Sequence, residues 1–393
     1  MFAAGFLLVD SIVQQLAETL RDASANKTPL RIVGGGTKDF YGNPTTGEAF
    51  STRAYCGIVD YEPTELVITA RAGTPLTDIE AALHDNGQML AFEPPHFSTA
   101  FASPLAGSAP LAALSPKGEE NIERPMPETR IATVGGCIAA GLSGPRRAYA
   151  GAVRDLVLGV RILDGNGADL HFGGQVIKNV AGYDVSRLMA GAMGTLGVIL
   201  EVSLKTLPLP TTEMTLRQQH SEAGAIRLMN AWAGQPLPIS ATAWNDGDLG
   251  IRLSGAASAV QAAHKKLGGE VVDPAQAAKF WNGVRDHTDA FFRRDKTLWR
   301  LSVKSTALAI TLPGAQMIEW SGALRWLHTE ASADEVRSAA AQAGGHATLF
   351  RGGKSADGAF HPLSPALATI HRKLKQTFDP AGILNPGRLY SGM

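Results

Sequence analysis

The sequence predicts an α+β protein of two domains, with a glycine-rich N-terminal half followed by a half of alternating hairpins and amphipathic helices. Three observations support this prediction. The chain has 393 residues, and a single hydrophobic core seldom serves a chain of that length. Glycine accounts for 43 of the residues, about 11% where about 7% is average, and most of the excess lies before Gly197. Beyond Pro210 the texture changes to helices and hairpins.

The first predicted elements are a helix and a strand that ends in consecutive glycines. Apolar residues between positions 8 and 20 repeat at helical spacing. Residues 30–33, Leu-Arg-Ile-Val, read as a short strand that continues into Gly34-Gly35-Gly36-Thr37-Lys38. Consecutive glycines expose backbone N–H groups that can converge on phosphate oxygens. A plain tight turn accounts for this tripeptide equally well.

The rest of the N-terminal half alternates strands with glycine-containing turns. Residues 66–70 predict a strand, and Thr74 with Pro75 begins a helix that Gly87 ends. Residues 98–129, rich in Ala, Pro and Ser, predict a surface loop. Two further strands are expected, one ending in the turn signal Asp164-Gly-Asn-Gly167 and one at residues 198–204.

The C-terminal half predicts a second α+β layer. The turn Asn245-Asp-Gly-Asp248 lies between apolar runs, as in a hairpin. Helices are expected over residues 256–267 and 333–343, and a strand over 299–304. A last helix begins at Ser364-Pro365 and ends before Leu384-Asn-Pro-Gly-Arg388.

Composition excludes several functional classes. Lys and Arg total 36 and Asp and Glu total 36, so no basic face for nucleic acid is expected. The two cysteines, Cys56 and Cys137, form no CxxC pair and predict neither a metal centre nor a disulfide framework. The apolar run at residues 2–9 is too short to span a bilayer. We therefore expect a cytoplasmic protein without a direct membrane span.

Spacing excludes other familiar sites. No stretch matches the G-x-G-x-x-G dinucleotide fingerprint, and Gly353-Lys-Ser355 lacks the glycine that a Walker loop needs at position 348. The histidines include no HExxH pair, and Ser143 lacks the G-x-S-x-G elbow. These absences predict no metal site.

An ordered set of motifs resembles the vanillyl-alcohol-oxidase-type, or PCMH-type, FAD-binding flavoproteins. The resemblance spans nearly the whole chain and, within that superfamily, is closest to the FAD-binding E subunit of glycolate oxidase. The motifs that carry it are the residue 29–38 loop, Glu62–Val67 with Ala70–Gly73, Phe92–His96, Ala132–Gly136, Gly141–Gly151, Lys178–Asp184, Gly194–Gly197 and Leu384–Arg388.

The resemblance implies a fold and a set of cofactor contacts. A two-subdomain PCMH-type FAD-binding domain would cover residues 1–207 with a loop insertion at 98–129. A smaller α+β cap domain would cover 208–350, and a C-terminal segment, 351–393, would return to the FAD domain. The implied FAD contacts are Val33, Gly34, Gly35, Gly36, Thr37 and Lys38 at the pyrophosphate, Thr133, Val134, Gly135, Gly136, Ser143 and Gly144 along the flavin, Asp155, Gly197 and Val198 towards the adenosine, and Asn385 at the isoalloxazine.

Two departures from the family pattern shape the expected role. Relatives with covalently attached flavin have a histidine where Thr37 stands, so FAD is expected to be non-covalent. The family's 2-hydroxy-acid dehydrogenases carry a histidine-rich metal site near the position of His346, and only that histidine is retained. Lys178 and Tyr183 are the remaining candidates for holding a substrate carboxylate, and a structural role for them is as plausible.

Three functions remain open from the sequence. The preferred one is an FAD subunit of a glycolate oxidase complex, which oxidises glycolate, a small 2-hydroxy acid, to glyoxylate. Its implied partners are a catalytic flavoprotein subunit and an iron-sulfur subunit, and they could hold it at the inner membrane. The alternatives are a stand-alone FAD-dependent D-2-hydroxy-acid dehydrogenase of the D-lactate type and a non-catalytic FAD-bearing assembly subunit.

Overall fold

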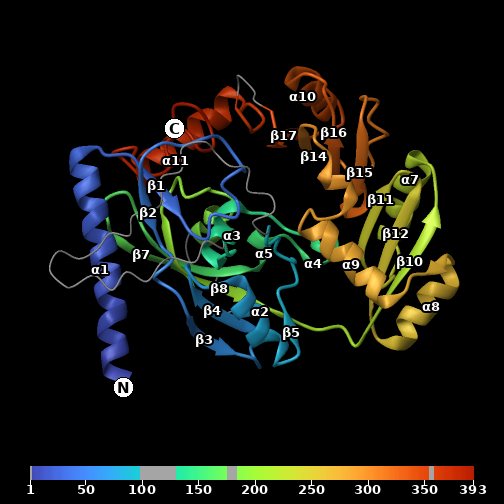
Figure 1. Cartoon of the computed structure of the whole chain (residues 1–393), viewed down its shortest axis with the longest axis horizontal. Helices are drawn as coiled ribbons and strands as arrows, with labels where there is room; N and C mark the ends of the chain where they lie inside the picture. Colours follow the sequence, from blue (N-terminus) through green and yellow to red (C-terminus); the bar gives the residue numbers. More distant parts are fainter. Residues whose placement is uncertain (1, 98–129, 175–183, 354–357) are drawn as a thin grey trace.

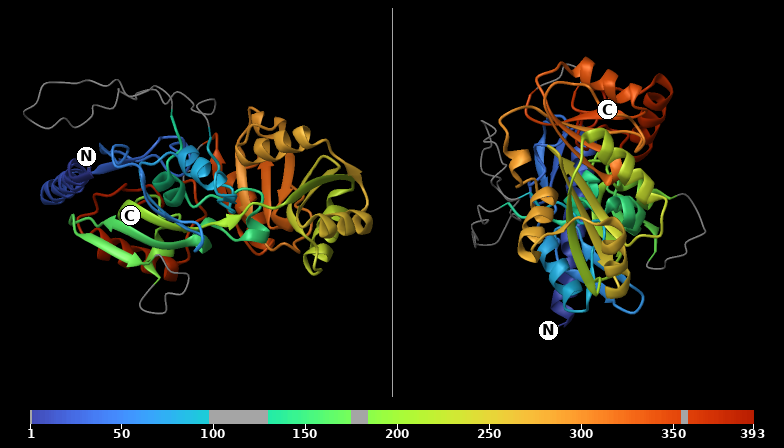
Figure 2. Two further views of the ribbon diagram at one scale, coloured as in Figure 1. Left: turned by 90° about the horizontal axis from the view of Figure 1, so that it is seen from below. Right: turned by 90° about the vertical axis from the view of Figure 1, so that its right-hand side faces the viewer.

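Two β-sheets lie side by side in the computed structural model of the chain, each with helices packed against it (Figure 1; Figure 2, left). The structure describes residues 2–97, 130–174, 184–353 and 358–393. The predicted loop insertion at 98–129 falls outside these residues. The α+β class expected from the sequence is confirmed.

The first sheet has five antiparallel strands in the order β3-β4-β8-β6-β7. Its strands are β3 (Ile58–Glu62), β4 (Val67–Arg71), β6 (Val157–Leu163), β7 (Asp169–Gly173) and β8 (Val198–Lys205). Strands β6 and β7 are joined through the Asp164–Gly167 turn, as predicted; Asp164 Oδ1 accepts hydrogen bonds from the backbone N–H groups of Asn166 and Ala168.

Both faces of this sheet are covered, which explains its nearly continuous apolar strands. On one face Ile68, Ile162 and Val202 pack with residues of α2 and α3. On the other, Val198 and Leu200 pack with residues of α1 and the β1–β2 pair. The covering elements are α1 (Phe2–Asn26), β1 (Leu30–Val33), β2 (Glu48–Ser51), α2 (Leu76–His84), α3 (Val134–Ala140), α5 (Val153–Leu156) and α6 (Val185–Met189). The short helix α4 (Arg147–Ala150) lies instead against the second sheet.

The second sheet has eight antiparallel strands in the order β13-β10-β12-β11-β15-β16-β14-β17. Its predicted hairpin is confirmed: Asp246 and Gly247 have φ values of 48° and 90°, which suits a two-residue turn. The strands are β10 (Thr212–Gln219), β11 (Ile239–Asn245), β12 (Asp248–Gly255), β13 (Glu270–Val271), β14 (Leu298–Ser302), β15 (Ala315–Glu319), β16 (Leu324–His328) and β17 (His346–Arg351). The helices of this half are α7 (Glu222–Ala233), α8 (Ala257–Leu267), α9 (Pro274–Arg285), η2 (Ala290–Arg293), η3 (Trp320–Gly322) and α10 (Ala333–Gln342).

An apolar cluster joins the two halves. Leu142 and Met193 from the first half pack with Trp326 and Phe350 from the second. The chain then continues through α11 (Pro365–Phe378) and returns to β1, where the Leu30 N–H donates to the Ile383 carbonyl at 2.8 Å. The last residues therefore lie beside the first strand.

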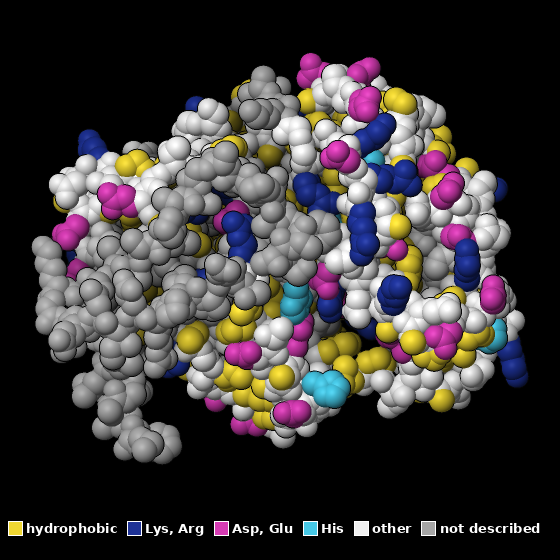
Figure 3. All heavy atoms as spheres, in the orientation of Figure 1, with side chains coloured by type: hydrophobic (Ala, Val, Ile, Leu, Met, Phe, Trp, Pro, Cys, Tyr) yellow, Lys and Arg dark blue, Asp and Glu magenta, His cyan; other side chains and the backbone are white. Residues whose placement is uncertain are grey.

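The domain boundaries expected from the sequence stay predictions. The short strand β9 (Leu207–Pro208), which pairs with β5 (Gln88–Met89), straddles the boundary after residue 207, and the edge strand β17 straddles the one after residue 350. None of the helices in the described part of the chain is long and apolar enough to cross a membrane. Basic and acidic side chains are interspersed on the face shown in Figure 3.

Candidate cofactor site

The predicted glycine loop lies directly against the start of α3. A Cβ on Gly34 would come within 2.6 Å of the Thr133 hydroxyl oxygen, and a Cβ on Gly35 would overlap the Ile131 carbonyl. Gly36 has a φ of +72°, which residues with a side chain rarely adopt. These three positions therefore require glycine for close approach and for backbone conformation, and this requirement argues against an ordinary surface turn.

The first turn of α3 forms the facing wall. Thr133 caps the helix by accepting a hydrogen bond from the Gly136 N–H at 3.4 Å. Gly135 packs on β4, since a Cβ there would lie 2.6 Å from the Ala72 side chain. Because Gly135 and Gly136 have no side chains, there is room for a ligand between this turn and the glycine loop.

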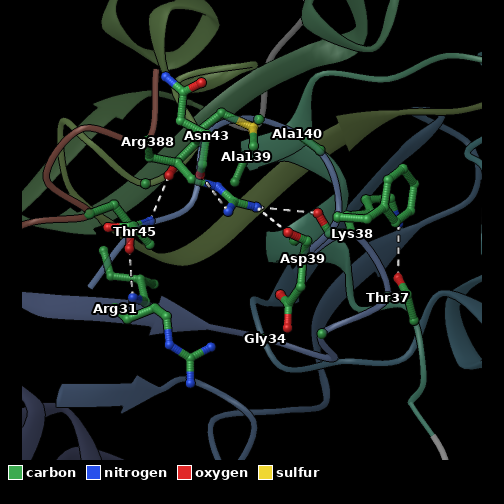
Figure 4. A pocket seen from close by; sticks show the side chains of 18 of the residues that line it. Arg31, Gly34, Thr37, Lys38, Asp39, Asn43, Thr45, Ala139, Ala140 and Arg388 are labelled. Atoms are coloured by element: carbon green, nitrogen blue, oxygen red, sulfur yellow. Dashed lines mark hydrogen bonds between the residues drawn. The ribbon is translucent and has the colours of Figure 1, made fainter. Parts of the chain in front are cut away.

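Between these walls lies a cavity of about 860 Å³, within the range usual for cofactor sites. Its walls come from the glycine loop, α3, the segment after α6, β17 and the C-terminal segment, and Figure 4 shows part of this lining. Ten of the predicted FAD-binding residues line it: Gly34, Gly35, Gly36, Thr37, Lys38, Thr133, Gly135, Gly136, Gly197 and Asn385.

Lys38 is a buried cation in the cavity wall. Its Nζ donates to the Thr37 hydroxyl at 3.4 Å and lies 5.6 Å from the centroid of the Phe97 ring. Burial lowers the pKa of the Lys38 amine, although the carboxylate of Asp286 opposes the shift. A buried ammonium in such a place would stabilise negative charge on a bound ligand.

Asn385 joins three segments around the cavity. Its Oδ1 accepts a hydrogen bond from the Ile32 N–H at 2.8 Å, and its Nδ2 donates to the Met193 carbonyl at 2.7 Å. Its backbone φ is 42°. The residue thus lines the cavity and also holds β1 against the segment after α6, and its predicted contact with the isoalloxazine stays a prediction.

Arg388 closes the same wall and was not among the predicted site residues. Its guanidinium donates to the carbonyls of Asn43 at 2.9 Å, Asp39 at 3.1 Å and Lys38 at 3.3 Å (Figure 4). The Leu384–Arg388 motif contains this residue, but nothing in the sequence indicates that its target is the backbone after the glycine loop.

Six predicted contacts do not line the cavity. Ser143 Oγ accepts a hydrogen bond from the Val153 N–H at 3.0 Å, and Asp155 Oδ2 accepts one from the Ala152 N–H at 2.9 Å. Gly144 is fixed between Phe92 and Trp320. The other three, Val33, Val134 and Val198, have buried side chains that pack in the core. FAD contacts by these six residues remain predictions.

The two substrate-side candidates, Lys178 and Tyr183, lie outside the described residues. Within the described part of the chain, no group of three or more His, Cys, Asp or Glu side chains is arranged to hold a metal ion. His346, the histidine that occupies the expected region, is the first residue of β17.

Two parts of the chain match known families. Residues 11–115 match the family described as FAD binding domain, and residues 352–389 match the FAD linked oxidases, C-terminal domain. These two matches contain the glycine loop and the Asn385–Arg388 segment, which meet at the cavity.

Relatives were found in both sequence and structure. The chain is 47% identical over 378 residues to glycolate oxidase subunit GlcE of Escherichia coli K12, a match covering 96% of this chain and 97% of that protein. It is 41% identical over 87 residues to glycolate oxidase subunit GlcD of Bacillus subtilis, covering 22% of this chain and 18% of that one. The structure of alkyldihydroxyacetonephosphate synthase superposes with a TM-score of 0.61 at 15% identity, covering 96% of this chain and 76% of that one, and confirms the predicted fold.

Proposed function

Because the chain belongs to the family of the FAD-binding glycolate oxidase subunit GlcE, we propose that it serves as the FAD-bearing, electron-handling subunit of a glycolate-oxidising complex. The predicted family and cofactor are confirmed: the chain is an FAD-dependent oxidoreductase. We further propose that glycolate is the substrate, that one partner is an iron-sulfur subunit and that the protein is cytoplasmic. The near full-length similarity to a glycolate oxidase subunit is the observation that supports it most.

FAD fits the described site. The cleared space between Gly34–Gly36 and the first turn of α3 suits a pyrophosphate, because backbone N–H groups can reach its oxygens there. We propose that Thr37 and Lys38 continue this contact, with the Thr37 hydroxyl offering a hydrogen bond and Lys38 a positive charge. FAD bound here would accept the two electrons that leave a CH–OH group on oxidation.

The chain's own residues supply positioning and charge at this site. Asn385 and Arg388 hold the glycine loop and the C-terminal segment together through hydrogen bonds to backbone groups. Phe97 and Phe350 also line the cavity, and the Phe97 ring lies beside Lys38. In this surrounding the positive charge of Lys38 would stabilise the negative charge of a reduced cofactor.

A proton acceptor for the substrate hydroxyl is the missing part. Among the described residues that line the cavity, Asp39 is the one carboxylate and no histidine is present. Asp39 lies 3.9 Å from Arg130, so its carboxylate faces an arginine of the same wall. This lining supports a subunit that relays electrons over one that oxidises glycolate alone.

The proposed partners are a catalytic flavoprotein subunit and an iron-sulfur subunit. The similarity to GlcD of Bacillus subtilis extends over 87 residues, so a flavoprotein partner of related sequence is a reasonable expectation. This chain has only two cysteines, too few for the usual four thiolate ligands of an iron-sulfur cluster. The partners could also bring the complex to the inner membrane.

Anaerobic reduction of the flavin tests the proposal. Glycolate added to the purified, FAD-loaded chain should leave the flavin spectrum unchanged, and glycolate added after the partner subunits should bleach it. Bleaching of the isolated chain by glycolate or D-lactate would favour a stand-alone dehydrogenase, as the 37% identity over 92 residues to a D-lactate dehydrogenase of Anaerostipes hadrus allows. Bleaching in the complex that leaves the flavin of this chain oxidised would favour an assembly subunit.

A further inference from the structure

Two arginine side chains meet at one tryptophan between the two sheets. Cζ of Arg147, at the start of α4, lies 4.4 Å from the centroid of the Trp320 ring, and Cζ of Arg300, on β14, lies 5.2 Å from it. The indole is buried, and its Nε1 donates to the Gly144 carbonyl at 3.0 Å. The ring is therefore fixed, and both cations are within cation–π distance of it.

Neither guanidinium has an acceptor among the residues that the structure describes: the side chains of Arg147 and Arg300 form no hydrogen bond and no salt bridge there. The neighbouring arginines differ. Arg146 and Arg252 both pair with Glu93, at 3.4 Å and 2.8 Å. Since both Arg147 and Arg300 are only partly buried, their unused donors remain open to a small ligand.

The electrostatics of this place favour an anion. Burial and the charge of Arg300 lower the pKa of Arg147, and the carboxylate of Asp155 opposes this shift. The nearby carboxyl of Glu319 does not balance these charges, because burial raises its pKa to about 8 and it is mostly protonated at neutral pH. Asp155 offsets part of the positive charge at Arg147, and a bound anion would reduce the repulsion that remains between the two arginines.

The arginine pair lies next to the FAD cavity. Arg300 is opposite Thr348 in the β14–β17 register, so Thr348 and Phe350 are on the same face of the sheet as Arg300. Phe350 lines the cavity, and residues two apart on a strand are roughly 7 Å apart. An anion held by Arg300 would therefore lie behind Phe350, the aromatic residue of the second sheet that forms part of the cavity wall.

We propose that Arg147 and Arg300 form a binding site for the carboxylate of a small 2-hydroxy or 2-oxo acid. A guanidinium presents two parallel N–H donors that match the two oxygens of a carboxylate. One arginine comes from each half of the chain, so a bound acid bridges the two sheets. The choice of acid rests on the proposed function, but binding can be measured without turnover.

Calorimetric titration with sodium glyoxylate at fixed ionic strength tests this site in the full-length, FAD-loaded chain. Arg147→Gln and Arg300→Gln should each raise the Kd about 10- to 100-fold, because each removes charged hydrogen bonds. The Kd of Arg300→Lys should fall between those of the wild type and Arg300→Gln, since lysine keeps the positive charge but lacks the two parallel N–H donors. Arg372→Gln, at an exposed arginine on α11, is the matched control and should leave Kd unchanged.

Unchanged glyoxylate affinity in both glutamine variants, with wild-type FAD content and melting temperature, would overturn the site. Sodium phosphate that competes as strongly as glyoxylate would overturn the assignment to carboxylates. Different results would refute the binding site and the proposed function. A complex that does not oxidise glycolate while the arginines still bind glyoxylate refutes the function alone. Normal glycolate oxidation by the complex, with glyoxylate affinity unchanged in both glutamine variants of this chain, refutes the site alone.

Discussion

The Glu93 carboxylate lies 2.8 Å from the guanidinium of Arg252, although Glu93 follows β5 in the first half of the chain and Arg252 is on β12 of the eight-stranded sheet. Arg146 donates its backbone N–H to the same carboxylate at 2.8 Å. Burial alone raises the pKa of Glu93, but the charges of Arg252 and Arg146 outweigh it and leave the pKa lowered. This ion pair joins the two halves.

Glu93→Gln should destabilise the chain by about 3 kcal/mol, because it removes the buried carboxylate shared by two buried arginines and leaves them only the partly exposed Glu213. Chemical unfolding at pH 7 measures this change. Glu213→Gln is the matched control: Glu213 contacts Arg146 at 2.9 Å but its side chain is 41% exposed, so about 1 kcal/mol or less is expected. Equal losses of unfolding free energy in both variants would show that burial does not make the Glu93 ion pairs contribute more to stability than the exposed Glu213 pair.

Glu319 makes stability depend on pH. Its pKa of about 8 lies above the ordinary value of 4.5, so between these two pH values the folded chain holds a proton that the unfolded chain releases. The contribution of Glu319 to the free energy of unfolding therefore falls as the pH rises from the lower to the higher of these values, by about 1 kcal/mol per pH unit. Above the higher value the contribution levels off.

Glu319→Gln should remove this dependence, because the amide keeps the acceptor for the Trp326 N–H and cannot ionise. The difference in melting temperature between variant and wild type should grow in the variant's favour from pH 5.5 to pH 7.5. A difference that stays constant over this range would contradict the protonated state.

Gly35→Ala should abolish FAD binding, since its Cβ would overlap the Ile131 carbonyl at the cavity wall. The flavin absorbance of the purified protein measures this loss. Gly234→Ala is the matched control, because a Cβ there has its nearest neighbour at 3.9 Å and the residue has an ordinary φ of −84°. Retention of FAD in the Gly35 variant would argue against the glycine loop as the cofactor site.

Acid precipitation should release all the flavin, because Thr37 stands where a histidyl attachment would be made. The supernatant should contain the yellow colour and the pellet none. Flavin that stays with the denatured chain would refute non-covalent binding.

Asn385→Ala should lower both stability and FAD affinity, because it leaves the Ile32 N–H and the Met193 carbonyl without partners. Each such buried group costs about 1–3 kcal/mol. Asn385→Asp keeps the acceptor for Ile32 and should recover part of the loss. FAD affinity that is unchanged in a less stable Asn385→Ala variant would limit the residue to a structural role.

The sequence predicted those parts of the fold and the site that local chemistry determines. The hairpin at Asp246-Gly247 needs residues that accept positive φ, and the glycine loop needs bare backbone, so both leave a local signal. Lys38 and Asn385 were placed at the site by motif resemblance, and both line the cavity.

Contacts between distant segments left no such signal. Arg388 binds backbone carbonyls some 350 positions earlier in the chain, and the pairing of Arg147 with Arg300 exists only after the two sheets meet. Ser143 and Asp155 show the opposite case: the resemblance implies an FAD contact for each, yet each side chain accepts a hydrogen bond from a backbone N–H nearby in sequence. Residue type alone cannot distinguish such a cap from a ligand contact.

Glycolate-dependent reduction of an electron acceptor by the complex assembled with the Gly35→Ala chain tests the central claim most directly. The variant should still assemble with its partners, because Gly35 lies at the cavity wall, and the complex should lose activity. Full activity in an assembled complex that lacks FAD in this chain would contradict an electron-handling role for the subunit.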